Sequence, residues 1–211
     1  KSQIINIESG NFKKAPRTDL DIIFDNSTFD PGNYIFEKMI SGGYFGGLCL
    51  TVLKTAAREG LFTVETGEQL SGLTDLSTND ANDFVSNPFP EANLFSEVNL
   101  FPESNPLRKC FIDMADAGKC SEIINALIER AAKLVAANLS AVILRTGKGK
   151  SVESPVLITA EGTTFYKMYN LRKKFEGFFN GFLSDERKRY VEFAEVPQSG
   201  LTGAALAGLI L

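Results

Sequence analysis

The sequence predicts an α/β fold in which helices pack against a sheet. Three short β-branched runs have strand composition: Ser2–Glu8 (SQIINIE), Val156–Ala160 (VLITA) and Tyr190–Val196. Long stretches between these runs show helical spacing of apolar residues, and the chain ends in a βαβα order. With 211 residues, of which 44% are hydrophobic, the chain can bury the core of one large domain or the cores of two small ones.

The first half of the chain is expected to be mostly helical. Residues 11–31 form a long loop with one apolar block, Leu20–Phe24, that predicts a strand or a turn of helix. A strong helix opens at Pro31-Gly32-Asn33 and stops at Gly60. Glycine in a helix interior costs about 1 kcal/mol relative to alanine. The four glycines inside this helix therefore indicate either close approach of a backbone or ligand, or a local break: Gly42, Gly43, Gly46 and Gly47.

The middle of the chain predicts short helices followed by two longer ones. Between residues 61 and 105 we expect short helices in loops, one of them capped by Ser77 with Asp80 three residues on. A helix beginning at Asn105-Pro106 is expected to end near Gly118. Ser121 should cap the next helix, which stops near Gly147.

The last quarter predicts a strand hairpin, a further strand and two helices. Glu161-Gly162-Thr163 is interpreted as a turn, and Phe165-Tyr166-Lys167 as a second strand or hairpin arm. Leu171–Leu183 should form an aromatic-rich helix, whose phenylalanines belong to the core or, alternatively, to a partner surface. Ser199-Gly200 leads into a closing helix of small residues, Gly203–Leu209.

The composition excludes several classes of function. The chain has no histidine, which removes Ser-His-Asp and Cys-His catalysis and histidine-ligated metals. A net charge of −4 argues against a nucleic-acid surface, and no apolar run reaches the roughly 18 residues of a membrane span. Cys49, Cys110 and Cys120 form no CxxC motif, which favours reduced thiols in a cytoplasmic protein, with a Cys110–Cys120 disulfide as the alternative.

Taken one at a time, the candidate functional residues are ordinary. Glu8 follows a predicted strand, where ligands of α/β sheets often bind, and Glu37 lies one turn inside the glycine-rich helix. The turn at Gly162 could hold a phosphate through backbone N–H groups and hydroxyls. The Gly147-Lys148-Gly149-Lys150 run follows a helix rather than a strand, so we interpret it as a solvated helix end and not as a phosphate loop.

Together, and in this order, five blocks resemble the hexokinase family. The family's segments N-x-E-W-G-A-F, EKMISG-x-Y-x-G, RRAA, D-G-T/S-x-Y-K and S-G-x-G-A-A are similar, in turn, to residues 6–12, 36–46, 129–134, 161–167 and 199–206. Ser9 stands where the family has tryptophan and Asn11 where it has alanine. Thr164 is an additional residue in the fourth block, and Leu201-Thr202 places two residues where the fifth has one.

The resemblance implies a fold and a set of site residues. The fold would be a ribonuclease-H-like, actin-like ATPase subdomain with a mixed sheet, packed helices and a long helical insertion. Hexose hydroxyls would be bound by Glu8, Glu37 and Gly42; ATP would be bound by Gly162, Thr163, Thr164, Ser199, Gly200 and Gly203. Mg²⁺ would be held through the nucleotide rather than by a protein metal site. Ionised carboxylates suit this role because they only accept hydrogen bonds, and a sugar offers several O–H donors.

The resemblance also implies an incomplete enzyme. The family's phosphate loop, its base aspartate and its G-T-G-T-N turn do not occur in this chain, and they would precede Lys1. We therefore expect residues 1–211 to be the C-terminal large subdomain of an ATP:hexose 6-phosphotransferase, to pair with its own N-terminal subdomain, to contain no catalytic residue and to be inactive alone. The alternative is a noncatalytic sugar- or nucleotide-binding protein of the actin-like fold.

Overall fold

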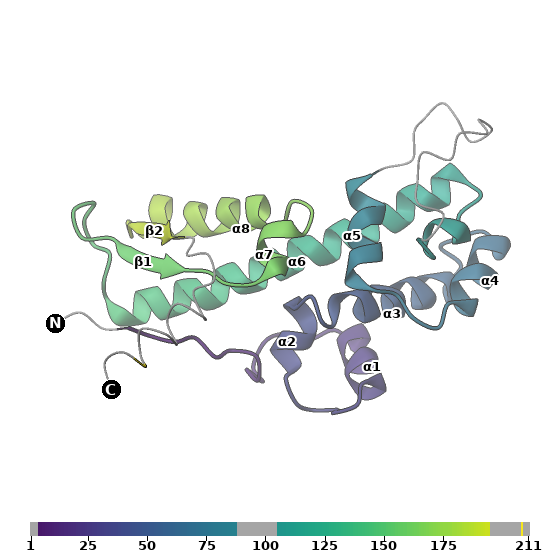
Figure 1. Ribbon diagram of the computed structural model, residues 1–211, viewed down its shortest axis with the longest axis horizontal. Coiled ribbons are helices and arrows are strands. Elements are labelled where there is room, and N and C mark those ends of the chain that lie inside the picture. Colours follow the sequence, from purple (N-terminus) through teal and green to yellow (C-terminus); the bar gives the residue numbers. More distant parts are fainter. Residues whose placement is uncertain (1–3, 88–104, 195–207, 209–211) are drawn as a thin grey trace. The chain divides into compact units, whose positions relative to one another are not determined.

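The protein divides into two compact units, which are described separately. The computed structural model describes residues 4–87, 105–194 and 208 (Figure 1). The first unit spans Lys1–Leu134 and the second spans Val135–Leu211. The predicted closing helix after Ser199-Gly200 lies outside the described residues.

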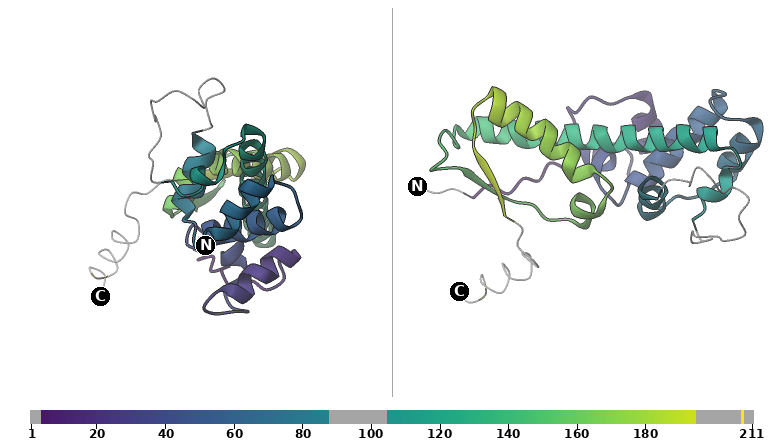
Figure 2. Two further views of the ribbon diagram at one scale, coloured as in Figure 1. Left: turned by 90° about the vertical axis from the view of Figure 1, so that its right-hand side faces the viewer. Right: turned by 90° about the horizontal axis from the view of Figure 1, so that it is seen from above.

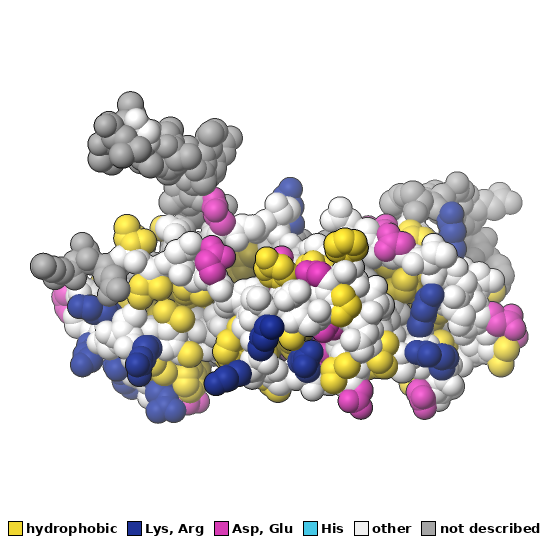
Figure 3. All heavy atoms as spheres, turned by 90° about the horizontal axis from the view of Figure 1, so that it is seen from below, with side chains coloured by type: hydrophobic (Ala, Val, Ile, Leu, Met, Phe, Trp, Pro, Cys, Tyr) yellow, Lys and Arg dark blue, Asp and Glu magenta, His cyan; other side chains and the backbone are white. Residues whose placement is uncertain are grey.

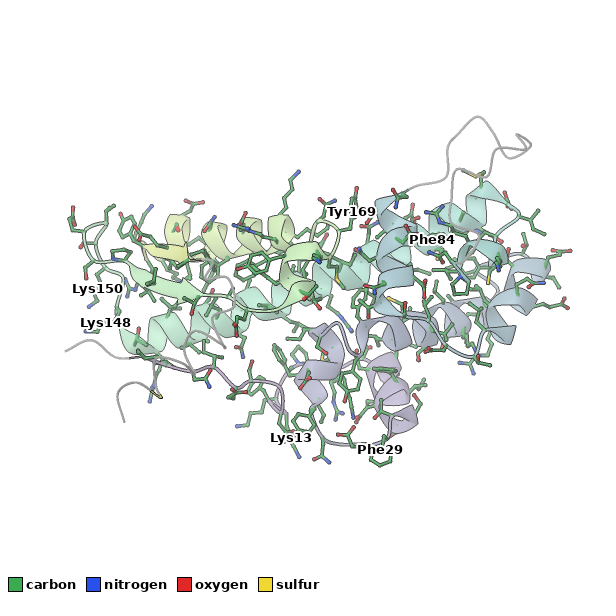
Figure 4. The ribbon with its side chains drawn as sticks, viewed as in Figure 1. Lys13, Phe29, Phe84, Lys148, Lys150 and Tyr169 are labelled. Carbon is green, nitrogen blue, oxygen red and sulfur yellow. The ribbon has the colours of Figure 1, made fainter. Side chains whose placement is uncertain are left out.

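The first unit is helical in its described part. Its elements are α1 (Asp19–Ser27), α2 (Ile35–Ile40), α3 (Phe45–Arg58), α4 (Val64–Gly72), α5 (Thr78–Ser86), the 3-10 turn η1 (Arg108–Cys110) and the first part of α6 (Met114–Thr146). Its buried side chains include Phe84, whose ring lies 5.4 Å from that of Phe111 (Figure 4). A second cluster joins Ile35, Phe36 and Met39 of α2 to Ala15.

The predicted first strand is not formed in the described residues 4–8. Ile4 and Ile5 are 97% and 45% exposed, and Ile7 is also exposed. A strand is stable only when a neighbouring strand satisfies its backbone and its apolar face is covered. The isoleucines supply the composition of a strand, but no described segment pairs with them.

Of the two alternatives predicted at Leu20–Phe24, a strand or a turn of helix, the structure shows the helix, α1. Thr18 caps α1 in a capping box, because its side chain accepts from the Asp21 N–H while the Asp21 carboxylate accepts from the Thr18 backbone N–H at 2.8 Å. Arg130 of α6 donates two hydrogen bonds, of 2.8 and 2.9 Å, to the same carboxylate. This paired geometry ties α1 to α6 within the first unit.

The glycine-rich segment has both a local break and a close approach of another backbone, the two alternatives that its glycines indicated. Ser41 is extended and separates α2 from α3, so the predicted single helix is broken there. At Gly46 another backbone approaches closely: a methyl group on this residue would meet the carbonyl oxygen of Leu76 and lie 2.5 Å from the carbonyl carbon of Ser77. Ser77 caps α5 by accepting from the Asp80 N–H, as predicted.

The boundary predicted between two helices at Gly118 is wrong. Helix α6 runs through Gly118 and Ser121 for 33 residues, as one continuous helix (Figure 2). A methyl group at Gly118 would meet no atom within 4 Å in the described part of the chain, so nothing there forces a turn. The predicted end is correct, because Gly147 follows the helix with φ of +67°.

The second unit contains the sheet. Strand β1 (Val156–Thr159) pairs in parallel with β2 (Val191–Ala194), and Val156 lies opposite Val191. The predicted hairpin is wrong, because residues Thr163–Lys167 form a short helix, α7. Parallel strands require a crossover rather than a tight turn, and α7 and α8 (Leu171–Asn180) lie between the two strands in the chain.

The aromatic helix α8 packs on this sheet. Phe193 of β2 has its ring 5.8 Å from that of Phe175 and 5.6 Å from that of Phe179. Phe175 and Phe179 are each 1% exposed, so they belong to the core, and the partner surface suggested as an alternative does not include them. The helix continues into a π-helical turn, η2 (Gly181–Glu186).

The three cysteines are buried and free, so the Cys110–Cys120 disulfide is not formed. Burial raises the pKa of the Cys110 thiol to about 11. Burial, reinforced by the neighbouring Cys49 and Cys110, also raises the pKa of Cys120 well above its ordinary value. These thiols therefore stay protonated at neutral pH, which keeps them unreactive.

A buried carboxylate makes the first unit sensitive to acid. Burial acts to raise the pKa of Asp116, but hydrogen bonds from Lys119 and from the N–H and hydroxyl of Thr63 outweigh it and hold the pKa far below its usual value. Because the folded pKa is depressed, this stabilisation is complete above pH 4 or so, the unfolded pKa, and is lost as pH falls below it.

We therefore expect Asp116→Asn to lower the free energy of unfolding by about 2 kcal/mol at neutral pH. The difference from the wild type should shrink as pH falls below about 4, because protonation then weakens the same contacts in the wild type. Urea unfolding across this pH range measures it. A difference that grows toward acid pH would contradict the assignment.

Candidate functional site

The first candidate residue, Glu37, lies at the start of α2 against a loop from the beginning of the chain. Its backbone N–H donates to the carbonyl oxygen of Gly10 at 3.0 Å. A methyl group at Gly10 would lie 2.9 Å from Oε2 of Glu37, so the carboxylate rests against the bare Cα of this glycine. Two segments that are distant in the sequence therefore meet at the Glu37 side chain.

Two further contacts hold the same loop on α2. The side-chain Oδ1 of Asn11 accepts from the Tyr34 N–H at 3.1 Å. The rings of Phe12 and Phe36 meet edge to face, 6.1 Å apart. Tyr34 has a φ of 49°, and no side chain of its own caps the helix, so the bond from Asn11 satisfies an N–H at the start of α2.

Glu8 lies two residues before this contact and is exposed. Its Oε1 accepts from the Asn6 side-chain amide at 3.0 Å, and a carboxylate can accept further hydrogen bonds. Glu37 is half-buried. The fold thus brings the segment that carries Glu8 onto the helix that carries Glu37.

Gly42 lies at the break that directly follows α2. The Thr78 hydroxyl donates to the carbonyl oxygen of Gly42 at 2.6 Å and accepts from the Gly46 N–H at 2.9 Å. One threonine from the start of α5 therefore fixes both sides of the glycine turn. Gly42 is half-buried and lies one residue after Ser41, whose N–H donates to the carbonyl oxygen of Glu37.

A buried ion network forms around Lys38, the residue of α2 that follows Glu37. Lys38 is 2% exposed, and its Nζ lies 2.8 Å from Asp25 and 3.1 Å from Asp30. Burial acts to lower the pKa of Lys38, but the hydrogen bonds to both aspartates outweigh it and raise the pKa. Asp25 also accepts from the Gly32 N–H, so the loop before α2 is fastened to the helix.

The candidate nucleotide turn lies in the second unit, at the end of β1. Gly162 is exposed with φ of +122°, a conformation that favours glycine, and Thr163 and Thr164 open α7. The Tyr166 hydroxyl donates to the carbonyl oxygen of Ala160 at 2.9 Å and closes the turn. The fold therefore presents two hydroxyls and an unobstructed backbone at this position.

The remaining nucleotide candidates Ser199, Gly200 and Gly203 lie outside the described residues. The basic run after α6 behaves as a solvated helix end, because Lys148 and Lys150 are both exposed (Figure 4). Within residues 4–87, 105–194 and 208, no group of three acidic or cysteine side chains could hold a metal ion. Basic, acidic and hydrophobic side chains are interspersed on the face that Figure 3 shows.

Sequence reasoning missed two residues of the first unit that shape the candidate sugar site: Gly10 and Lys38. Both stand inside the resembling blocks, close to Glu8 or Glu37. Asn11 was noted as a departure from the family pattern, but its bond to the Tyr34 N–H was not foreseen. The burial of Lys38 could not be foreseen either, because a lysine in a helix is almost always exposed.

Comparison with solved structures shows which known fold this chain has. The hexokinase from Schistosoma mansoni, solved in complex with glucose, superposes with a TM-score of 0.66 over 85% of this chain and 38% of that protein, at 18% identity. A second hexokinase crystal structure gives a TM-score of 0.65 over 90% of the chain, at 22% identity. The fold is therefore that of the hexokinases, whose architecture is actin-like.

Comparison with sequences identifies the family. The family model for hexokinase matches residues 1–210, and this chain belongs to the hexokinase family. Hexokinase-1 of Spinacia oleracea is 29% identical over 216 residues, which cover 96% of this chain and 41% of the spinach protein. Hexokinase-1 of Solanum tuberosum is 43% identical over 58 residues. The chain thus spans about two fifths of the length of the relatives that match it throughout.

One further property follows from the described helices. None of them, α6 included, is long and apolar enough to cross a membrane.

Proposed function

We propose that this chain supplies part of an ATP:hexose 6-phosphotransferase. The family match along residues 1–210 supports a sugar kinase portion. The observation that carries the sugar site is the contact between Gly10 and Glu37, because it brings the segment of Glu8 onto the helix of Glu37. In this proposal both carboxylates accept hydrogen bonds from sugar hydroxyls, and Gly42 lies beside the bound hexose.

The second unit would bind the nucleotide. Gly162, Thr163 and Thr164 would donate N–H and O–H hydrogen bonds to ATP phosphates, and Ser199, Gly200 and Gly203 would lie against the nucleoside. Mg²⁺ usually keeps waters and substrate phosphates as ligands, so a chain with few clustered acids is compatible with a magnesium ion carried by the nucleotide. That ion would neutralise charge on the phosphates.

The chain itself would position the hexose rather than move its proton. Phosphoryl transfer depends mainly on alignment of the acceptor hydroxyl and on charge neutralisation. Glu8 and Glu37 would fix the sugar ring, whereas the base that takes the hydroxyl proton is expected in an N-terminal subdomain. Residues 1–211 alone should then bind hexose weakly and phosphorylate none, and measurable phosphorylation would contradict this division of roles.

The sugar role is tested by Glu37→Gln and Glu8→Gln. Each change should weaken glucose binding by about tenfold or more, because a charge-assisted hydrogen bond becomes a neutral one. Binding is measured by titrating glucose into the chain and following backbone amide resonances. Glu68→Gln, which neutralises an exposed acid of α4, is the matched control and should leave affinity unchanged. Equal affinities in all four proteins would refute the proposed sugar site.

A further inference from the structure

The loop after Glu8 contacts α2 in a way that acts directly on the Glu37 carboxylate. Gly10 contributes its carbonyl oxygen to the Glu37 N–H at 3.0 Å, and its Cα faces Oε2 of the same residue. Asn11 contributes its side-chain oxygen to the Tyr34 N–H at 3.1 Å. These contacts hold the backbone and the side chain of Glu37 against the segment that carries Glu8.

The absence of a side chain at Gly10 decides where the carboxylate lies. A Cβ atom there would lie 2.9 Å from Oε2 and 3.5 Å from the Cβ atom of Glu37, so the carboxylate would have to move. The φ of Gly10 is not in the left-handed region, so alanine can adopt this backbone without strain. The carboxylate is the end of a flexible side chain, so it can rotate away while the fold stays intact.

Asn11 acts on the same helix from its first turn. Its Oδ1 bonds the N–H of Tyr34, three residues before Glu37, in a residue held at a φ of 49°. Alanine at this position could not accept this hydrogen bond. The bond holds the start of α2, and so it also holds the backbone from which the Glu37 side chain extends.

We propose that Gly10 and Asn11 are positioning residues that fix the Glu37 carboxylate relative to Glu8. This inference rests on the proposed function, in which both acids bind one hexose. Both would act through Glu37: Gly10 leaves the space that the carboxylate occupies, and Asn11 anchors the helix that carries it. A sugar hydroxyl is bound strongly only when the acceptor is already in place, since otherwise the side chain must be ordered on binding.

Two measurements on the whole chain test the inference. The first is the side-chain carboxyl ¹³C resonance of Glu37 without ligand. It should move in Gly10→Ala and in Asn11→Ala, and it should not move in Gly72→Ala, where an added methyl group meets no atom within 4 Å in the described residues. An unmoved Glu37 resonance in Gly10→Ala would overturn the inference.

The second measurement compares the glucose affinity of each variant with its melting temperature. Gly10→Ala should weaken glucose binding by about tenfold without lowering the melting temperature, because alanine restricts the unfolded chain and only a flexible group must move. Asn11→Ala should weaken binding severalfold, and Asn11→Asp, which keeps the acceptor oxygen, should restore the Glu37 resonance. Asp116→Asn, which removes the buried carboxylate bound by Thr63 and Lys119 in the same unit, should lower stability without changing affinity.

The two proposals fail in different ways. If the wild-type chain shows no glucose binding while the Glu37 resonance still moves in Gly10→Ala, the proposed function fails and the positioning role stands. If the wild type binds glucose and Gly10→Ala binds it equally well, the positioning role fails and the proposed function stands.

Discussion

Replacing Gly46 with alanine is expected to destabilise the first unit by about 3 kcal/mol or more. The added methyl group would meet the carbonyl oxygen of Leu76, the carbonyl carbon of Ser77 at 2.5 Å and the backbone nitrogen of Thr78 at 2.6 Å. These are backbone atoms, which cannot rotate away as a side chain can. The segment before α5 must therefore shift, and the hydrogen bond from the Gly46 N–H to Thr78 is lost with it.

The same substitution at Gly118 is the control. Gly118 lies inside α6, and a methyl group there meets no atom within 4 Å in the described residues. Alanine favours a helix interior over glycine, so Gly118→Ala should raise the free energy of unfolding by about 0.5 to 1 kcal/mol. Urea denaturation of both variants measures the contrast. If both variants changed the free energy of unfolding in the same direction and by similar amounts, the close packing at Gly46 would be contradicted.

Replacing Lys38 with methionine should cost about 3 to 5 kcal/mol of stability. Methionine has nearly the same length as lysine, so packing is largely kept while the charge is removed. Asp25, whose side chain is 8% exposed, would then lose the cation that lies 2.8 Å away and keep the longer contact of 3.6 Å with Arg17. A buried carboxylate that loses its main cation is costly, because its desolvation is then only partly offset.

The control for this prediction is Lys133→Met. Lys133 is 54% exposed on α6 and pairs with Glu129 at 2.7 Å. Exposed pairs of this spacing contribute only a few tenths of a kcal/mol, because water and salt screen them. Thermal and urea unfolding should therefore show a large loss in Lys38→Met and almost none in Lys133→Met. Equal losses would contradict the buried network.

The Lys38 network also bears on the sugar site. Lys38 follows Glu37 directly, and its aspartate partners lie in α1 and the loop before α2. The network anchors the short helix α2 through Lys38, and Gly10 and Asn11 hold it through Glu37 and Tyr34. A six-residue helix is not stable alone, so these tertiary contacts are what keep Glu37 in a fixed position.

Signals confined to a few residues predicted local structure well. Ser77 and Asp80 mark the start of α5, and Gly147 marks the end of α6. Each of these two signals depends on a hydrogen bond or a backbone angle within four residues. Such a signal therefore does not need contacts with distant parts of the chain. The capping box at Thr18 was equally local and could have identified α1.

Predictions that depended on contacts with distant segments of the chain were less successful. Ser2–Glu8 has strand composition, yet residues 4–8 form no strand, because strand formation needs a neighbour that composition cannot provide. Gly118 resembled a helix end, but α6 continues because its apolar residues keep packing on the core beyond it. The hairpin arm expected at residues 165–167 was wrong because these residues form the helix α7, and β1 pairs instead in parallel with the distant strand β2.

The sequence by itself determined the family, through five short blocks, and it named Glu8, Glu37 and the turn at Gly162 as candidates. The tertiary structure alone decided that Gly10 lies against the Glu37 carboxylate, that Gly46 lies against the backbone before α5, and that Lys38 is buried between aspartates. The reason is one of distance along the chain. Caps and turns depend on residues a few positions apart, whereas the bond from Gly46 to Thr78 spans 32 positions and forms only when the whole unit packs.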